Sequence, residues 1–91
     1  MKIRVQIVVS GLVQGVGFRY FAIRKAKEYS ITGYVMNLPS GEVLCEAEGD
    51  EGLVHEFIDE IKMGPRFSHV TDAKIIKKED LISYESFEVR F

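Results

Sequence analysis

The residues best suited to chemistry are three glycines and one arginine in the stretch SGLVQGVGFRYF, residues 10–21. The glycines are Gly11, Gly15 and Gly17, and the arginine is Arg19. Glycine adopts backbone conformations that other residues avoid, so this cluster indicates a tight bend or a close approach of the backbone to a ligand. The stretch follows an alternating apolar run and precedes a run with helical spacing, which places it at the start of a helix.

The start of a helix is suited to binding an anion. Its first backbone N–H groups have no intrahelical partner, and the helix dipole adds partial positive charge there. Glycines allow several N–H groups to converge on one point, and Arg19 in the first turn could hold two phosphate oxygens. The stretch lacks the Gly-Lys-Ser/Thr ending of a P-loop and the G-x-G-x-x-G spacing of a dinucleotide site. These residues alone leave a phosphate site and a simple tight turn equally open.

The rest of the chain predicts the elements that position this loop. Strands are expected over residues 2–10, 32–38, 42–49, 69–76 and 84–91, with a bulge in the fourth, and helices over residues 18–29 and 51–63. The PSG turn makes the second and third strands a hairpin, Asp50 is a suitable N-cap for the second helix, and Gly64-Pro65 ends it. The order β-α-β-β-α-β with an additional C-terminal strand predicts a ferredoxin-like α+β sandwich, in which two helices cover one face of an antiparallel sheet. We expect one domain over residues 1–91, because a chain of this length builds one core.

Composition excludes several classes of partner. The formal net charge is −2, from 12 basic and 14 acidic residues, which provides no general attraction to nucleic acid or to an acidic membrane. The one cysteine, Cys45, cannot form an intrachain disulfide, which fits a reducing compartment. No run resembles a signal peptide or a membrane span. We therefore expect a soluble, cytoplasmic protein.

Other reactive residue types have simpler explanations. His55 and His69 have no further ligand at a familiar metal-site spacing, so no metal is expected. Cys45 shares the apolar face of its strand with Val43 and Ala47 and is interpreted as a buried hydrophobic residue. The mixed run of residues 77–80 is interpreted as a solvated connection, and Phe18 as an anchor that holds the glycine loop to the core.

Two segments together resemble the signatures of the acylphosphatase family. The first is GLVQGVGFR, which matches the family's G-x-V-Q-G-V-G-F-R loop from Gly11 to Arg19. The second is GYVMNLPSG, in which Gly33, Val35, Asn37 and Gly41 match the family's G-x-V-x-N-x-x-x-G segment. The likeness extends over nearly the whole chain, and residues 64–75 follow the family pattern more loosely.

The resemblance implies a small metal-free hydrolase, without a cofactor, that splits the carboxyl-phosphate bond of acyl phosphates. It implies that Arg19 binds the phosphate together with the main-chain N–H groups of residues 14–19, which are Gln14, Gly15, Val16, Gly17, Phe18 and Arg19. It also implies that Asn37 holds the attacking water, although an asparagine before LPSG is by itself more typical of a turn cap. The leaving carboxylate is weakly basic, with a pKa of about 4, so the lack of an obvious catalytic acid is understandable.

Two alternatives remain at this point. One is a non-catalytic module that binds a small phosphate ligand through the same loop. The other is an RNA-binding module of the same fold, which needs exposed aromatic and basic residues on its central strands. Here the third strand presents Glu42, Leu44, Glu46 and Glu48 on its outer face, which would repel phosphate. We therefore expect an acyl phosphate as substrate and inorganic phosphate as product ligand, no nucleic-acid or membrane partner, and a monomer.

Overall fold

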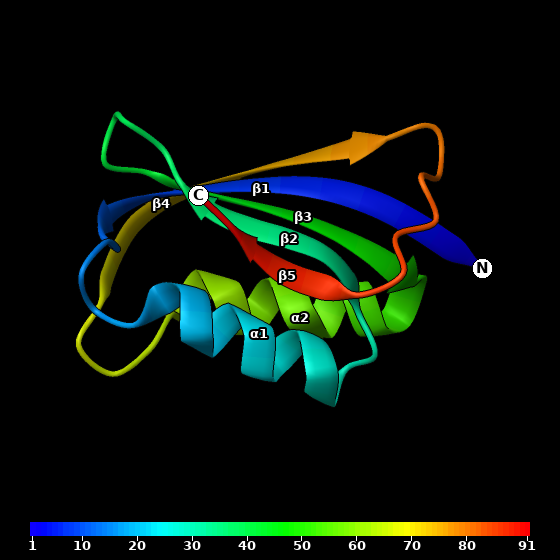
Figure 1. Ribbon diagram of the computed structural model, residues 1–91, viewed down its shortest axis with the longest axis horizontal. Helices are drawn as coiled ribbons and strands as arrows, with labels where there is room; N and C mark the ends of the chain where they lie inside the picture. The colour runs from blue at the N-terminus through cyan, green and yellow to red at the C-terminus, as the bar shows by residue number, and fades with distance from the viewer.

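The computed structural model describes residues 1–91 and consists of a five-stranded sheet with both helices packed on one of its faces (Figure 1). The strands are β1 (Lys2–Leu12), β2 (Thr32–Asn37), β3 (Val43–Asp50), β4 (His69–Lys78) and β5 (Phe87–Arg90), and the helices are α1 (Phe18–Glu28) and α2 (Glu51–Met63). The order of elements and the α+β ferredoxin-like arrangement predicted from the sequence are confirmed.

Strands β1 and β3 are neighbours inside the sheet, whose order is β4-β1-β3-β2-β5 with β3 at its centre. They pair antiparallel from Lys2 opposite Asp50 to Val9 opposite Val43. Their alternating apolar residues all point to the helical face and are at most 5% exposed: Ile3, Val5, Ile7, Val9, Val43, Cys45 and Ala47. Cys45 is therefore the buried hydrophobic residue that the alternation predicted, and burial raises the pKa of its thiol.

The sheet is mixed, so the prediction of a purely antiparallel sheet is wrong. Strand β5 runs parallel to β2, with Gly33 opposite Phe87 and Val35 opposite Val89. The cause is topological. The crossover through α1 gives β1 and β2 the same direction, and β4 runs opposite to both. The connection after β4 reverses the direction of the chain again. Strand β5 therefore pairs with β2 in the same direction as β2.

Each helix buries one face against the core. Helix α1 buries Phe18, Ala22 and Ala26, with Phe21 in addition, and α2 buries Val54, Phe57 and Ile61. Asp50 is the N-cap residue of α2, but its side chain makes no capping hydrogen bond. Gly64 ends α2 with a φ of 72°, which explains why Gly-Pro stops the helix there. Neither helix is long and apolar enough to cross a membrane.

Strand boundaries shift slightly from those predicted. Strand β1 continues to Leu12, β4 continues to Lys78, and β5 is shorter than expected because residues 84–86 are not in the sheet. The irregular alternation of the fourth strand has the predicted cause. Ser10 pairs with Asp72 whereas Gly11 pairs with Val70, which leaves Thr71 as the extra residue of a β-bulge.

The connection between β4 and β5, residues 79–86, covers part of the sheet face opposite the helices (Figure 1). The interpretation of residues 77–80 as a solvated connection is correct for the exposure of Lys77, Glu79 and Asp80, but it is wrong in treating the whole run as a connection. Lys77 and Lys78 belong to β4, and Asp80 accepts hydrogen bonds from the buried Arg4 at its carboxylate and its carbonyl, both over 2.9 Å. Arg4 also donates to Glu46 over 2.6 Å, as a buried ion pair.

The acidic outer face of β3 is consequently closed. Glu46 and Glu48 are each 3% exposed rather than open to solvent as predicted. The Glu48 carboxylate accepts the backbone N–H groups of Ile82 and Tyr84 over 2.7 and 2.9 Å. Burial acts to raise the pKa of Glu48, but these backbone donors and Arg4 outweigh it and hold that pKa below its usual range. These two carboxylates are therefore not open to a ligand, whereas Leu44 on the same face is half-buried.

Glu48 is expected to make the free energy of unfolding fall as the pH is lowered. Because its pKa is lower in the folded than in the unfolded protein, it stabilises the fold above the ordinary glutamate pKa of about 4.3, and the contribution is lost as the pH falls below that value. Replacing Glu48 by Gln is expected to lower the free energy of unfolding at neutral pH by about 1–3 kcal/mol, because buried donors lose a charged acceptor. It should also flatten the loss of stability on the acid side.

Urea unfolding at a series of pH values measures both effects. The exposed Glu56 of α2, changed to Gln, is the matched control and should leave the acid-side slope as in the parent. An unchanged slope in Glu48→Gln would show that Glu48 is not the group that titrates with unfolding.

Candidate active site

Three segments that are distant in the sequence meet at one end of the molecule, on the left in Figure 1. They are the connection between β1 and α1, the end of β2 with the turn that follows it, and the end of β5 at Phe91. The first contains the glycine loop and Arg19, and the second contains Asn37. The two signature segments of the sequence are thus neighbours in space.

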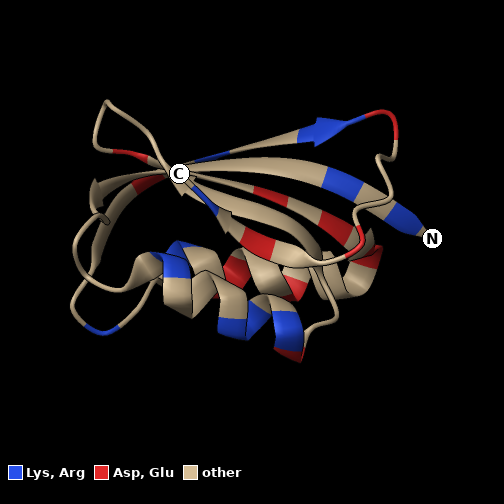
Figure 2. Ribbon diagram, in the orientation of Figure 1, with Lys and Arg blue, Asp and Glu red and all other residues tan.

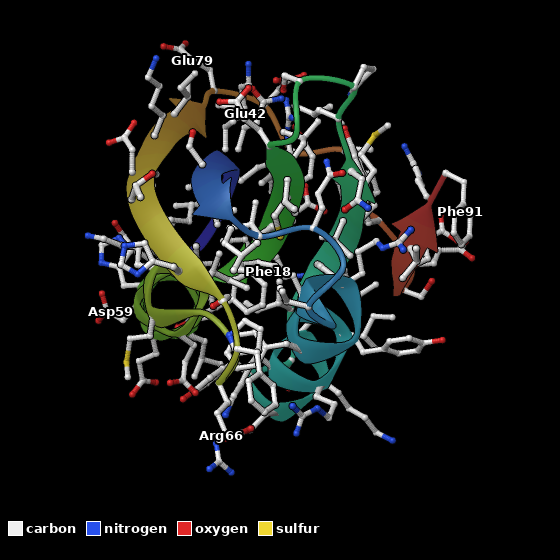
Figure 3. The ribbon with its side chains drawn as sticks, turned by 90° about the vertical axis from the view of Figure 1, so that its left-hand side faces the viewer. Phe18, Glu42, Asp59, Arg66, Glu79 and Phe91 are labelled. Atoms are coloured by element: carbon white, nitrogen blue, oxygen red, sulfur yellow. The ribbon has the colours of Figure 1, made fainter.

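The glycine loop is anchored at both of its ends. Val13 is fully buried and Phe18 is 2% exposed, and Figure 3 shows the Phe18 side chain inside the molecule, beneath the loop. The role of Phe18 as an anchor is thereby confirmed. Gly15 and Gly17, between these anchors, have φ angles of 74° and 80°. A Cβ at either position would meet no atom within 4 Å, so glycine is needed for the backbone conformation and not for space.

This conformation leaves the backbone donors of the loop unpaired. No backbone carbonyl accepts a hydrogen bond from an N–H group of residues 14–20. The first N–H group after the loop that has a backbone acceptor is that of Phe21, which donates to the carbonyl of Gly17. Gly15 and Gly17 have left-handed conformations while Val16 between them does not. Such an alternation is typical of a nest, a concave group of N–H donors, and here it lies at the positive end of α1.

The Gln14 side chain joins the loop to the turn after β2. Its Nε2 donates to the backbone carbonyls of Leu38 and Glu42, each over 2.9 Å. The same turn is closed by Leu38 N–H to Glu42 at 2.8 Å and Gly41 N–H to Leu38 at 3.0 Å. The Asn37 side chain takes no part in these bonds, so it does not cap the turn. The family resemblance implies a role only for the main-chain N–H of Gln14, and the bridging role of its side chain is visible only in the structure.

A pocket of about 140 Å³ lies between the loop and the end of β2. Its lining comprises Val13, Gly15, Gly17, Phe18, Arg19, Tyr20 and Asn37. Arg19 and Asn37 therefore face one hollow, although 18 positions separate them in the sequence. Of the other residues proposed to bind phosphate, Gln14 and Val16 are not part of the lining, and the Val16 side chain packs against the core. The volume suits a tetrahedral anion with a few waters.

Arg19 is the charged side chain of this pocket and forms no ion pair within the protein. Its guanidinium lies 5.3 Å from the centre of the Phe91 ring, a cation–π contact from the end of β5. Basic residues gather on α1, where Arg19, Arg24, Lys25 and Lys27 face a single acidic residue, Glu28, whereas α2 and β3 carry mostly acidic residues (Figure 2). Within the pocket, the positive charge available to a ligand comes from Arg19 and the start of α1.

Two other features of the molecule do not form a competing site. No three His, Cys, Asp or Glu side chains lie close enough together to hold a metal ion. A larger hollow of about 390 Å³ between α1 and β5 is lined by residues such as Ile23, Ile31 and Phe87, with Lys27 as its charged residue. It lacks the converging polar groups that a binding site for a small polar molecule requires.

The chain is similar to known proteins over nearly its whole length. The family model for acylphosphatase matches residues 5–89. The acylphosphatase of Chlorobaculum tepidum is 49% identical to this chain over 86 residues, which cover 94% of each protein. The acylphosphatase of Archaeoglobus fulgidus is 47% identical over 89 residues, which cover 98% of this chain and 99% of the relative. The crystal structure of acylphosphatase from Bacillus subtilis superimposes with a TM-score of 0.95 at 36% identity and covers 98% of this chain and 99% of that one.

The glycine nest, the unpaired arginine and the asparagine thus occur on a ferredoxin-like sandwich. The chain belongs to the acylphosphatase family, as the two signature segments in its sequence indicated.

The Gln14 bridge predicts a local loss of order when it is removed. Gln14→Leu removes two hydrogen bonds whose acceptor carbonyls each retain one backbone partner, so the free energy of unfolding should fall by about 1–2 kcal/mol. The amides of Leu38 and Gly41 should exchange with solvent faster than in the parent, as measured by NMR-detected hydrogen exchange. Gln6→Leu is the control, because Gln6 donates to Glu46 and not to this turn. Equal exchange at Leu38 and Gly41 in parent and Gln14→Leu would contradict the bridging role.

Proposed function

We propose that this protein hydrolyses the carboxyl-phosphate bond of acyl phosphates to give a carboxylate and inorganic phosphate. The observation that carries the proposal is the single pocket lined jointly by Arg19, Asn37 and the glycine nest. One water adds to phosphorus while the bond between phosphorus and the carboxyl oxygen breaks. The carboxylate leaves with the electron pair, and both protons of the water stay on the phosphate until they exchange with solvent.

Arg19 and the backbone N–H groups of residues 14–19 bind the phosphoryl oxygens in this mechanism. Phosphoryl transfer needs positioning and stabilisation of charge on the three equatorial oxygens more than it needs covalent chemistry. A guanidinium without an internal carboxylate partner and several unpaired N–H groups provide that positive field. These groups act without a metal ion or cofactor.

Asn37 positions the attacking water through its amide oxygen, which accepts a hydrogen bond without becoming charged. A general acid is not required, because a carboxylate with a pKa of about 4 leaves without protonation. This accounts for a pocket whose lining contains no histidine and no carboxylate. Holding the water in line with the bond that breaks is then the remaining contribution to the rate.

We further propose that residues 1–91 act as a single acylphosphatase domain, as a soluble cytoplasmic monomer without nucleic-acid or membrane partners. The free and buried Cys45 and the small net charge support this assignment. A spectrophotometric assay of benzoyl phosphate hydrolysis with EDTA present tests the activity. A folded protein that binds phosphate but does not consume benzoyl phosphate would instead be a binding module.

Asn37→Ala is expected to keep the fold and to lower kcat by a factor of about 10²–10³, the usual cost of removing one preorganised polar group from an active site. Steady-state hydrolysis of benzoyl phosphate measures this factor. Ser40→Ala, in the exposed part of the following turn, is the control and should keep the parent kcat. Undiminished turnover by folded Asn37→Ala would remove Asn37 from the mechanism.

Arg19→Ala is expected to weaken the binding of inorganic phosphate roughly 10- to 100-fold, because a charged hydrogen-bond donor is lost. Isothermal titration calorimetry with phosphate gives the affinity directly. Arg24→Ala removes an exposed arginine one turn and a half further along α1 and should leave the affinity unchanged. If the two variants bind phosphate equally well, the phosphate does not lie against Arg19.

A further inference from the structure

Strand β5 forms one edge of the sheet, and its outer side has no neighbouring strand. The carbonyl of Ser86, just before β5, accepts a hydrogen bond from the N–H group of Gly33 in β2. Successive residues of a strand direct their N–H and C=O groups to opposite sides, so those of Phe87 and Val89 point away from β2. No backbone hydrogen bond outside the pairing with β2 involves residues 87–91. The outward groups are therefore free to pair with the backbone of a further strand.

Two hollows follow one another along this edge, between β5 and α1. One has a volume of about 390 Å³ and lies at the start of β5, where Phe87 and Ile23 contribute to its lining. The other has a volume of about 200 Å³ and lies at the end of β5, where Val89 and Tyr20 contribute to its lining. Figure 1 shows α1 running alongside β5. The two hollows together form the α1–β5 groove.

The arrangement of the hollows suits the side chains of an added strand. Every second side chain of a strand points to the same face, at a repeat of about 7 Å. Phe87 and Val89 are two residues apart, and both pack against the core on the helical side of the sheet. A strand beside β5 would likewise direct every second side chain toward α1. Apolar side chains at the two ends of the groove would enter the hollows, where the Tyr20 ring is 77% exposed.

The α1 side of the groove is positively charged. Lys27 lines the larger hollow, and Arg24, one turn earlier, lies on the same side of the helix. Both side chains are exposed and form no ion pair, whereas Lys25 pairs with Glu28 and Glu60. The concentration of basic residues on α1 is visible in Figure 2. The groove therefore complements a ligand that is acidic between its apolar groups.

We propose that the α1–β5 groove binds an extended acidic peptide segment of another protein, which adds to the sheet beside β5. The peptide backbone pairs with the outward N–H and C=O groups of Phe87 and Val89, and apolar side chains of the peptide fill the two hollows. A carboxylate between them lies against Arg24 and Lys27. An anionic lipid surface or a nucleic acid offers no groups in the spacing that pairs with a strand edge. The inference does not depend on the proposed hydrolysis.

The test uses a peptide with threonine at every second position and glutamate, valine, glutamate, phenylalanine and glutamate at the others, acetylated and amidated at its ends. Isothermal titration calorimetry measures its affinity, with excess inorganic phosphate present as a competitor for the Arg19 pocket. Methylation of the threonine nitrogens, or of the nitrogens of the other residues, blocks one edge of the peptide at a time. One methylated peptide should bind at least about ten-fold more weakly than the unmethylated peptide, and the other should bind about as well. Equal affinity of the two methylated peptides, or no binding by the unmethylated one, would overturn strand addition.

Charge reversal on α1 tests whether the peptide lies in the groove. Lys27→Glu should weaken binding of the glutamate peptide roughly five-fold, and a peptide with lysine in place of glutamate should bind this variant more tightly than the parent protein. Lys62→Glu, which changes an exposed lysine in the last turn of α2, is the matched control and should bind both peptides as the parent does. If the two variants bind the glutamate peptide equally well, the groove is not its site.

Amide hydrogen exchange measured by NMR reports on the strand edge directly. The N–H groups of Phe87 and Val89 should exchange with solvent more slowly once the peptide is bound, because they gain acceptors. The amides of β4, at the opposite edge of the sheet, should exchange as in the free protein. Unchanged exchange at Phe87 and Val89 in the peptide-bound protein would overturn the proposal.

Discussion

The site depends on the burial of two side chains, Val13 and Phe18, at the two ends of the glycine loop. Each is almost completely removed from water, so the ends of the loop are held to the core while residues 14–17 stay at the surface. Gly15 and Gly17 then turn the backbone without strain, and the N–H groups of the loop lack internal acceptors. The burial of Val13 and Phe18 thereby holds the glycine loop in a conformation that exposes its unpaired N–H groups to a ligand.

The two arginines Arg4 and Arg19 show how the same side chain serves stability or function. Arg4 is buried and pairs with Glu46 and Asp80, which joins the 79–86 connection to the outer face of the sheet. Arg19 has no carboxylate partner and contacts an exposed aromatic ring. A buried guanidinium needs its charge compensated within the fold, whereas one at the mouth of a pocket can keep its charge for a ligand.

The shape of the proposed active site follows from the sheet order. Strand β2 carries Asn37 at its end and pairs with both β3 and β5, so Asn37 lies on the strand next to the one that leads to Phe91. Helix α1 supplies Arg19 and Tyr20 from its first turn, and the Gln14 bridge sets the distance between the loop and β2. The Gln14 side chain thus joins the glycine loop to the turn after β2, the two segments on either side of the pocket.

Much of this protein could be read from its sequence, because the signals are local. Alternating apolar residues identified β1 and β3, the 3.6-residue spacing and Gly64 defined α2, and the glycines with Arg19 marked the loop. The tertiary structure alone decided the parallel pairing of β5, the closure of the outer face by residues 79–86, the Gln14 bridge and the place of Phe91 beside Arg19. Each of these joins residues that lie far apart along the chain, and no periodicity or turn signal within either segment specifies its distant partner.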